Sequence, residues 1–118
     1  MSDRRLLVVN ESDGALYRID LDPRAPHGRT ITRIDGATVR QGEGMVLDGH
    51  RLVVADFHGL SMVDLTDDAG RATAVSQLRD PAFDADFSVV RIADRYVAVN
   101  SNTGDDQPYV LVSVPAAA

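Results

Sequence analysis

The sequence predicts an all-β protein, and more specifically a β-propeller segment of about two and a half blades. Short apolar segments with alternating or β-branched residues recur along the chain, separated by polar turns rich in Gly, Asp and Asn. No segment has a sustained helical period. Closely similar six-residue segments also recur at offsets of 46 and 44 residues. A repeat of that length with about four short strands is typical of a propeller blade.

Residues 42–66 show the strand pattern most clearly. Two apolar runs are joined by Asp48 and Gly49, a pair that favours a tight hairpin because both residues tolerate positive φ. A third run follows after His58 and Gly59, and similar strands and turns precede and follow this stretch. The expected strands cover residues 6–9, 15–21, 30–34, 45–47, 51–55, 60–65, 73–78, 87–92, 95–99 and 109–114.

The repeat assigns these strands to blades. RLLVVN (residues 5–10), RLVVAD (51–56) and RYVAVN (95–100) match position by position. With the strands of a blade named A to D from the channel outward, the chain runs B-C-D, then A-B-C-D, then A-B-C. The whole chain, 1–118, is then one partial propeller with repeats at about 4–35, 36–79 and 80–115. A non-repetitive sandwich is the alternative.

Blades bury their faces against one another, and propellers close as rings of roughly 4 to 8 blades. A segment this short leaves blade faces uncovered. We therefore expect the chain to be completed either by further blades or by self-association with copies of itself.

Composition narrows the classes of partner. The 118 residues, 44% of them hydrophobic, are enough for one domain with a sizeable core. The net charge is −6, and the basic residues are all Arg scattered among Asp, which argues against nucleic acid and anionic membranes as partners. The absence of cysteine excludes disulfides, thiolate metal sites and a cysteine nucleophile.

The start of the sequence runs directly into an expected strand. Its apolar part is too short for a secretory h-region or a membrane span. We expect a cytoplasmic location for the chain as given, or secretion if the N-terminus is truncated.

The stretch GEGMVLDGHRLVVADFHGLSMVDL resembles the repeat of the senescence-marker-protein and gluconolactonase family of six-bladed propellers, which is shared with other propellers of the NHL kind. In that family an Asp-Gly-Met or Asn-Gly-Leu step opens strand A, followed by a hairpin, an apolar strand B and a Gly-containing turn. The resemblance covers most of the chain as about the C-terminal half of such a propeller. It implies a central divalent metal, calcium or zinc, held by carboxylate and amide oxygens and polarising a lactone or phosphoester toward water.

The resemblance also indicates candidate ligands. Glu43 occupies the position of the family's Asp before Gly-Met, with a longer side chain, and becomes a candidate metal ligand and catalytic base. One repeat later the equivalent position is Phe87, which cannot bind a metal, although Asp86 lies beside it. The first repeat has no A strand. Several convergent ligands are needed, and the sequence offers Glu43 with Asp86 as a second candidate.

Blade topology predicts which residues share a rim with Glu43, because the turns before strand A and between strands B and C open on one side. His50 and Asp94 should lie on the other side. The candidate rim and substrate-binding residues are Asn10, Glu11, Asp56, Phe57, His58, Asn100 and Asn102.

Each of these candidates also has a structural interpretation. Asn10, Asp56 and Asn100 occupy one repeated strand end, where a short polar side chain commonly forms an Asx turn. His58 can be an exposed turn residue. Two further patterns are Asp84 with Asp86, which suits a solvated carboxylate pair, and Asn100, Asn102 and Asp105, which resemble a calcium loop without its closing glutamate.

Two functions from different classes follow. The first is an incomplete or non-catalytic propeller module with a binding or structural role, related to lactonase-like propellers and taking a small-molecule ligand. The second is a metal-dependent hydrolase of the lactonase or esterase type, active only when further blades or a second copy complete the ring. The small number of candidate ligands at the A-strand starts favours the first.

Overall fold

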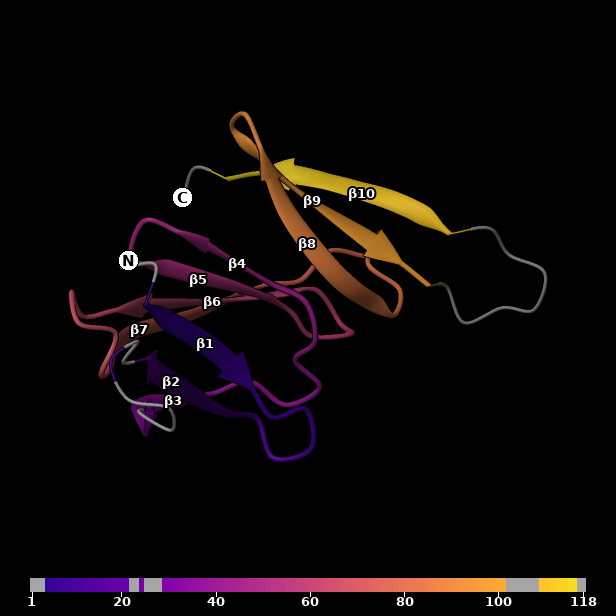
Figure 1. Ribbon diagram of the computed structural model, residues 1–118. Helices are drawn as coiled ribbons and strands as arrows, with labels where there is room; N and C mark the ends of the chain where they lie inside the picture. Colours follow the sequence, from indigo (N-terminus) through magenta and orange to yellow (C-terminus); the bar gives the residue numbers. More distant parts are fainter. Residues whose placement is uncertain (1–3, 22–23, 25–28, 102–108, 117–118) are drawn as a thin grey trace.

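The computed structural model describes residues 4–21, 24, 29–101 and 109–116, and within them the secondary structure consists of ten strands in three antiparallel sheets (Figure 1). Strands that are consecutive in the chain are neighbours in each sheet. The first sheet contains β1 (Arg5–Val9), β2 (Ala15–Leu21) and β3 (Arg29–Thr38). The second contains β4 (Met45–Asp48), β5 (Arg51–Ala55), β6 (Leu60–Leu65) and β7 (Ala72–Leu78). The third contains β8 (Asp86–Ile92), β9 (Arg95–Asn100) and β10 (Val110–Pro115).

This arrangement confirms the predicted fold class. The three sheets have the expected strand order B-C-D, A-B-C-D and A-B-C of a partial propeller. In the described part of the chain, no helix is both long and apolar enough to cross a membrane.

The strands lie where the sequence predicts them, except that β3 is longer. It runs from Arg29 to Thr38 instead of ending at residue 34. A register shift in its pairing with β2, between Ala15 and Tyr17, accommodates the extra length. Gly36 adopts φ of +93°, and a Cβ there would come within 2.9 Å of the Ala72 carbonyl oxygen. A glycine therefore lets the outer strand continue close to β7.

The second sheet lies between the other two and packs against both (Figure 1). Alternate residues of β5 point to opposite faces, as strand geometry requires. Leu52 and Val54 pack in a cluster with the first sheet, whereas Val53 and Ala55 pack in a cluster with the third. The core is thus divided into two apolar layers, one at each junction between sheets.

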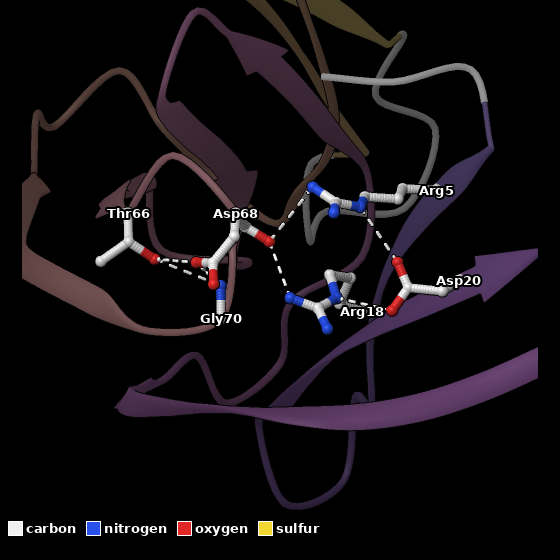
Figure 2. Close-up of polar contacts among 6 residues, drawn as sticks. All are labelled: Arg5, Arg18, Asp20, Thr66, Asp68 and Gly70. Atoms are coloured by element: carbon white, nitrogen blue, oxygen red, sulfur yellow. Dashed lines mark hydrogen bonds and ion pairs between the residues drawn. The ribbon is translucent and has the colours of Figure 1, made fainter.

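Polar contacts close the junction between the first and second sheets at one end (Figure 2). The carboxylate of Asp20 accepts hydrogen bonds from Nε of Arg5 at 3.0 Å and Nε of Arg18 at 2.9 Å. Arg18 also donates through Nη1 to the carbonyl oxygen of Asp68 at 2.8 Å, in the turn between β6 and β7. The Asp68 side chain in turn accepts from the Thr66 hydroxyl at 2.7 Å and the Gly70 N–H at 3.0 Å. The first sheet therefore holds a turn of the second by its backbone.

An equivalent contact joins the second and third sheets. Asp48, the last residue of β4, accepts hydrogen bonds from the Tyr96 hydroxyl at 2.7 Å and from Arg91 Nη1 at 2.5 Å. The hydrogen bonds from Tyr96 and Arg91 lower the pKa of Asp48. The carboxylate therefore stays ionised, and the two sheets keep a fixed relative position at this end.

Candidate functional site

An open groove of about 300 Å³ lies at the opposite end of the junction between the first and second sheets. The connection after β3 forms one wall, and the ends of strands in the second sheet form the other. Asp56 and His58, both predicted as rim residues, line it. The remaining lining residues are Thr38, Val39, Arg40, Gln41, Ser61, Gln77 and Arg79.

The Asp56 side chain accepts several hydrogen bonds within the groove. It is buried and accepts hydrogen bonds from Arg79 Nη2 at 2.9 Å and from the Ser61 hydroxyl at 2.5 Å. Its Oδ1 also accepts from the His58 N–H at 3.2 Å, which is the expected Asx turn. Asp56 thus has both a structural role in the turn and a charged partner in the groove.

Sequence reasoning did not find Arg79. It follows β7 and reaches an aspartate that is 23 residues away in the chain. No local motif marks such a pair, because the contact depends on β5 and β7 lying in one sheet. The acidic residue at the end of β5 was the only available signal.

His58 connects the two walls of the groove. Its Nε2 lies 3.0 Å from Oε1 of Gln41, and its ring meets the Phe57 ring edge to face at 5.4 Å. The backbone around this rim is strained: Gln41, Phe57 and Ala85 adopt φ of 60°, 76° and 57°. Ala69 and Ala93, in turns at the other end of the sheets, adopt the same left-handed conformation, with φ of 55° and 53°. This conformation therefore occurs in turns at both ends and does not single out this rim.

Asp86 is a second unusual group on the same side of the molecule. It is fully buried, and neither carboxylate oxygen has a hydrogen-bond partner in the part of the chain that the structure describes. Burial raises its pKa to about 6, and the charge of Asp56 adds to this shift. Backbone hydrogen bonding joins the two regions, since the Phe57 N–H donates to the Asp86 carbonyl at 3.0 Å.

The strand register corrects one sequence alignment. Asp86 pairs with Asn100 whereas Ser88 pairs with Val99, so the pairing skips Phe87. Asn100 is the repeat equivalent of Asp56. An irregularity at the start of β8 thus shifts the register by one residue. As a result Asp86, and not Phe87, lies opposite Asn100 at the end of β9.

The other residues predicted for the site, where the structure describes them, do not line the groove. Glu43 is exposed, and its N–H donates to the Ala55 carbonyl at 2.9 Å where β4 begins. Asn10 is exposed and forms an Asx turn with the Ser12 N–H at 2.9 Å. Asn100 is buried and holds the loop before β8, accepting from the Asp84 N–H at 3.1 Å and donating to the Ala82 carbonyl at 2.7 Å. Asn102 and Asp105 lie outside the described residues.

His50, which was expected on the other side, lies in the turn after β4, and its Nε2 is 3.1 Å from Asp67 Oδ1 in the turn between β6 and β7. Asp94 lies in the turn between β8 and β9, where its carbonyl accepts from the Ala116 N–H at 2.8 Å. Both turns are at the end that carries the Asp48 and Asp68 contacts.

The described residues do not form a complete metal centre. No group of three or more His, Asp or Glu side chains among them lies close enough to hold a metal ion. Asp86 has the oxygen donors that a hard cation prefers. Asp56 is already bound to Arg79 and Ser61. For the divalent metal implied by the resemblance, the described residues therefore provide one unpartnered carboxylate but not a complete set of ligands.

The fold and the rim define an all-β protein of stacked antiparallel sheets with a polar groove at one end of a sheet junction. No protein-family model matches the sequence, and no curated protein matches it significantly.

Proposed function

We propose that the chain is an incomplete or non-catalytic β-propeller module, related to lactonase-like propellers of the senescence-marker-protein and gluconolactonase family, that binds a small anionic molecule. The groove between the first and second sheets is the observation that carries this proposal. Its volume is at the lower end of the range of roughly 300 to 1,000 Å³ common for ligand sites. A ligand there must be small.

The lining of the groove selects the chemistry of the ligand. Arg40 and Arg79 contribute two positive charges and Asp56 one negative charge, whereas the whole chain has a net charge of −6. The groove is therefore locally positive. Arg recognises carboxylates through paired hydrogen bonds, and Gln41 and Gln77 provide further donors and acceptors. A polyhydroxylated carboxylate matches this arrangement.

A titration with gluconate as the probe tests the proposal. We expect Arg40→Gln to weaken binding by about tenfold or more, because a hydrogen bond to a charged group contributes about 1.5–3 kcal/mol. Isothermal calorimetry measures the effect. Arg71→Gln is the matched control, since it removes the same charge from the turn between β6 and β7, outside the groove. Equal weakening by both variants, or no binding by the wild type, would contradict the proposal.

A metal-dependent lactonase or esterase is the second candidate, and the buried, unpartnered carboxylate of Asp86 favours it. Such activity requires ligands beyond the described residues, from further blades or from a second copy. In that case Glu43, two residues before β4 and at the same end of the sheets as Asp86, is the candidate base.

Calcium and zinc titrations followed by thermal unfolding distinguish this candidate. An ion that binds only the native state stabilises it by about 2.7 kcal/mol at one hundred times its dissociation constant. We expect stabilisation of the wild type and its loss in Asp86→Asn. If neither ion shifts the transition and no lactone is hydrolysed, the hydrolase has no support.

A further inference from the structure

The two ends of the stack of sheets expose apolar faces. In β1 the alternate residues Leu7 and Val9 pack toward the second sheet, whereas Leu6 and Val8 point away from it and are exposed. We call the outer surface of the first sheet the leading face. Besides Leu6 and Val8 it contains Ile19 and Ile31, which pair across the sheet in the same alternation.

The third sheet has a corresponding outer surface, the trailing face. Tyr96 and Ala98 of β9 pack toward the second sheet, and the residues between them point the other way. Ile92 and Leu111 on this surface are 58% and 68% exposed. The trailing face consists of Val90, Ile92, Val97, Val99 and Leu111.

The internal repeat shows that each end face corresponds to one of the two packed faces of the second sheet. Leu6 and Val8 are the repeat equivalents of Leu52 and Val54, which pack against the sheet before them. On the other side, Val97 and Val99 are equivalent to Val53 and Ala55, which pack against the sheet after them. The leading face thus has the pattern of a surface that receives a preceding sheet, and the trailing face the pattern of one that receives a following sheet.

From this we infer that the chain associates head to tail with a second copy of itself, the trailing face of each copy packing on the leading face of the other. The contact continues the packing already present at both internal junctions. Two chains contribute six sheets, and three would contribute nine. Closed propellers contain about 4 to 8 blades, so the ring that closes is a two-chain ring. The inference rests on the propeller-module part of the proposed function and does not require ligand binding.

The solution mass tests the inference directly. Light scattering over a concentration series should give twice the chain mass of 12.7 kDa as the limiting species. A folded monomer at every concentration, or open polymers without a limiting mass, would overturn it.

Two single variants test the head-to-tail geometry. Ile31→Asp places a charge on the leading face and Leu111→Asp places one on the trailing face, both at exposed positions. We expect each variant alone to be monomeric with an unchanged circular dichroism spectrum. Val75→Asp is the control, because Val75 is 45% exposed but belongs to the second sheet and to neither end face. It should remain dimeric.

Mixing the two variants gives the sharpest result. The intact trailing face of the Ile31→Asp chain can meet the intact leading face of the Leu111→Asp chain, so the mixture should recover a species of twice the chain mass. A face-to-face dimer predicts instead that one of the two variants stays dimeric alone, which would overturn the inference.

The ligand titration distinguishes a failure of this inference from a failure of the proposed function. The groove lies within a single chain, between its first and second sheets. Gluconate binding by a folded monomeric variant would support the binding role whatever the association state. A wild-type dimer that does not bind gluconate would leave head-to-tail association intact.

Discussion

Asp86 differs from the other acidic side chains of the rim because it is wholly buried without a hydrogen-bond partner among the described residues. A buried carboxylate favours its neutral form, and the nearby charge of Asp56 acts in the same direction. By contrast, Asp56 itself has a guanidinium and a hydroxyl as partners. Two aspartates on one side of the second and third sheets therefore have opposite environments.

The raised pKa makes stability depend on pH. The pKa of Asp86 rises from 3.8 to about 6 on folding, so between these values the native state binds more protons than the unfolded state. Stability from this group is present below pH 3.8 and is lost as the pH rises through about 6. The loss amounts to about 3 kcal/mol at pH 7.

Asp86→Asn should remove this dependence. Relative to the wild type, we expect its free energy of unfolding to increase by about 2.4 kcal/mol between pH 4 and pH 7. Urea unfolding at several pH values, in the presence of a chelator, measures the difference. Asp80→Asn is the control, because Asp80 is exposed and asparagine can keep its Asx turn with the Ala82 N–H. A difference between Asp86→Asn and wild type that does not change with pH would refute this account.

At the scale of the elements, the start of β4 and the start of β8 approach unusually closely. The Gly44 N–H donates to the Phe87 carbonyl at 2.9 Å. A Cβ on Gly44 would lie 2.6 Å from the Cα of Ser88 and 2.8 Å from the Phe87 carbonyl oxygen. Both atoms belong to the backbone and cannot move independently. The glycine before Met45 is thus required for the second and third sheets to meet at the rim.

Gly44→Ala should destabilise the protein by about 1–3 kcal/mol, because overpacking of this size forces the backbones apart. Urea unfolding at constant pH measures the loss. Gly49→Asn serves as the comparison: a Cβ at Gly49 meets nothing within 4 Å, and asparagine tolerates its φ of +63°. Equal stability of Gly44→Ala and wild type would show that the two strand starts can separate freely.

At the scale of the whole molecule, the chain is a stack of three sheets with two filled junctions and two uncovered ends (Figure 1). Each junction has an apolar layer and is closed at one end by aspartates and arginines, through Asp20 and Asp68 at the first and Asp48 at the second. Burying apolar surface is the main driving force of association. The mass and mixing experiments address the molecule at this scale, because they ask whether the stack continues into a second chain.

The all-β fold, nearly every strand and the blade order follow from the sequence alone, because period-two alternation, turn residues such as Asp48 and Gly49, and the threefold repeat are local or directly comparable patterns. The sequence also located Asp56 and His58 at strand ends that face one rim. The length of β3 did not follow, since it depends on the packing of Gly36 against Ala72.

The chemistry of the rim depends on contacts between segments that are far apart in the sequence. The contact between Asp56 and Arg79 and the groove walls of Arg40 and Gln41 arise from segments brought together by sheet pairing and stacking. The register shift at the start of β8 assigned Asp86 a place that the linear alignment gave to Phe87. Local patterns specify strands because each strand is stabilised by neighbours in a regular geometry. Side-chain partners far apart in the chain depend on the exact register and on how the sheets stack, which no local pattern records.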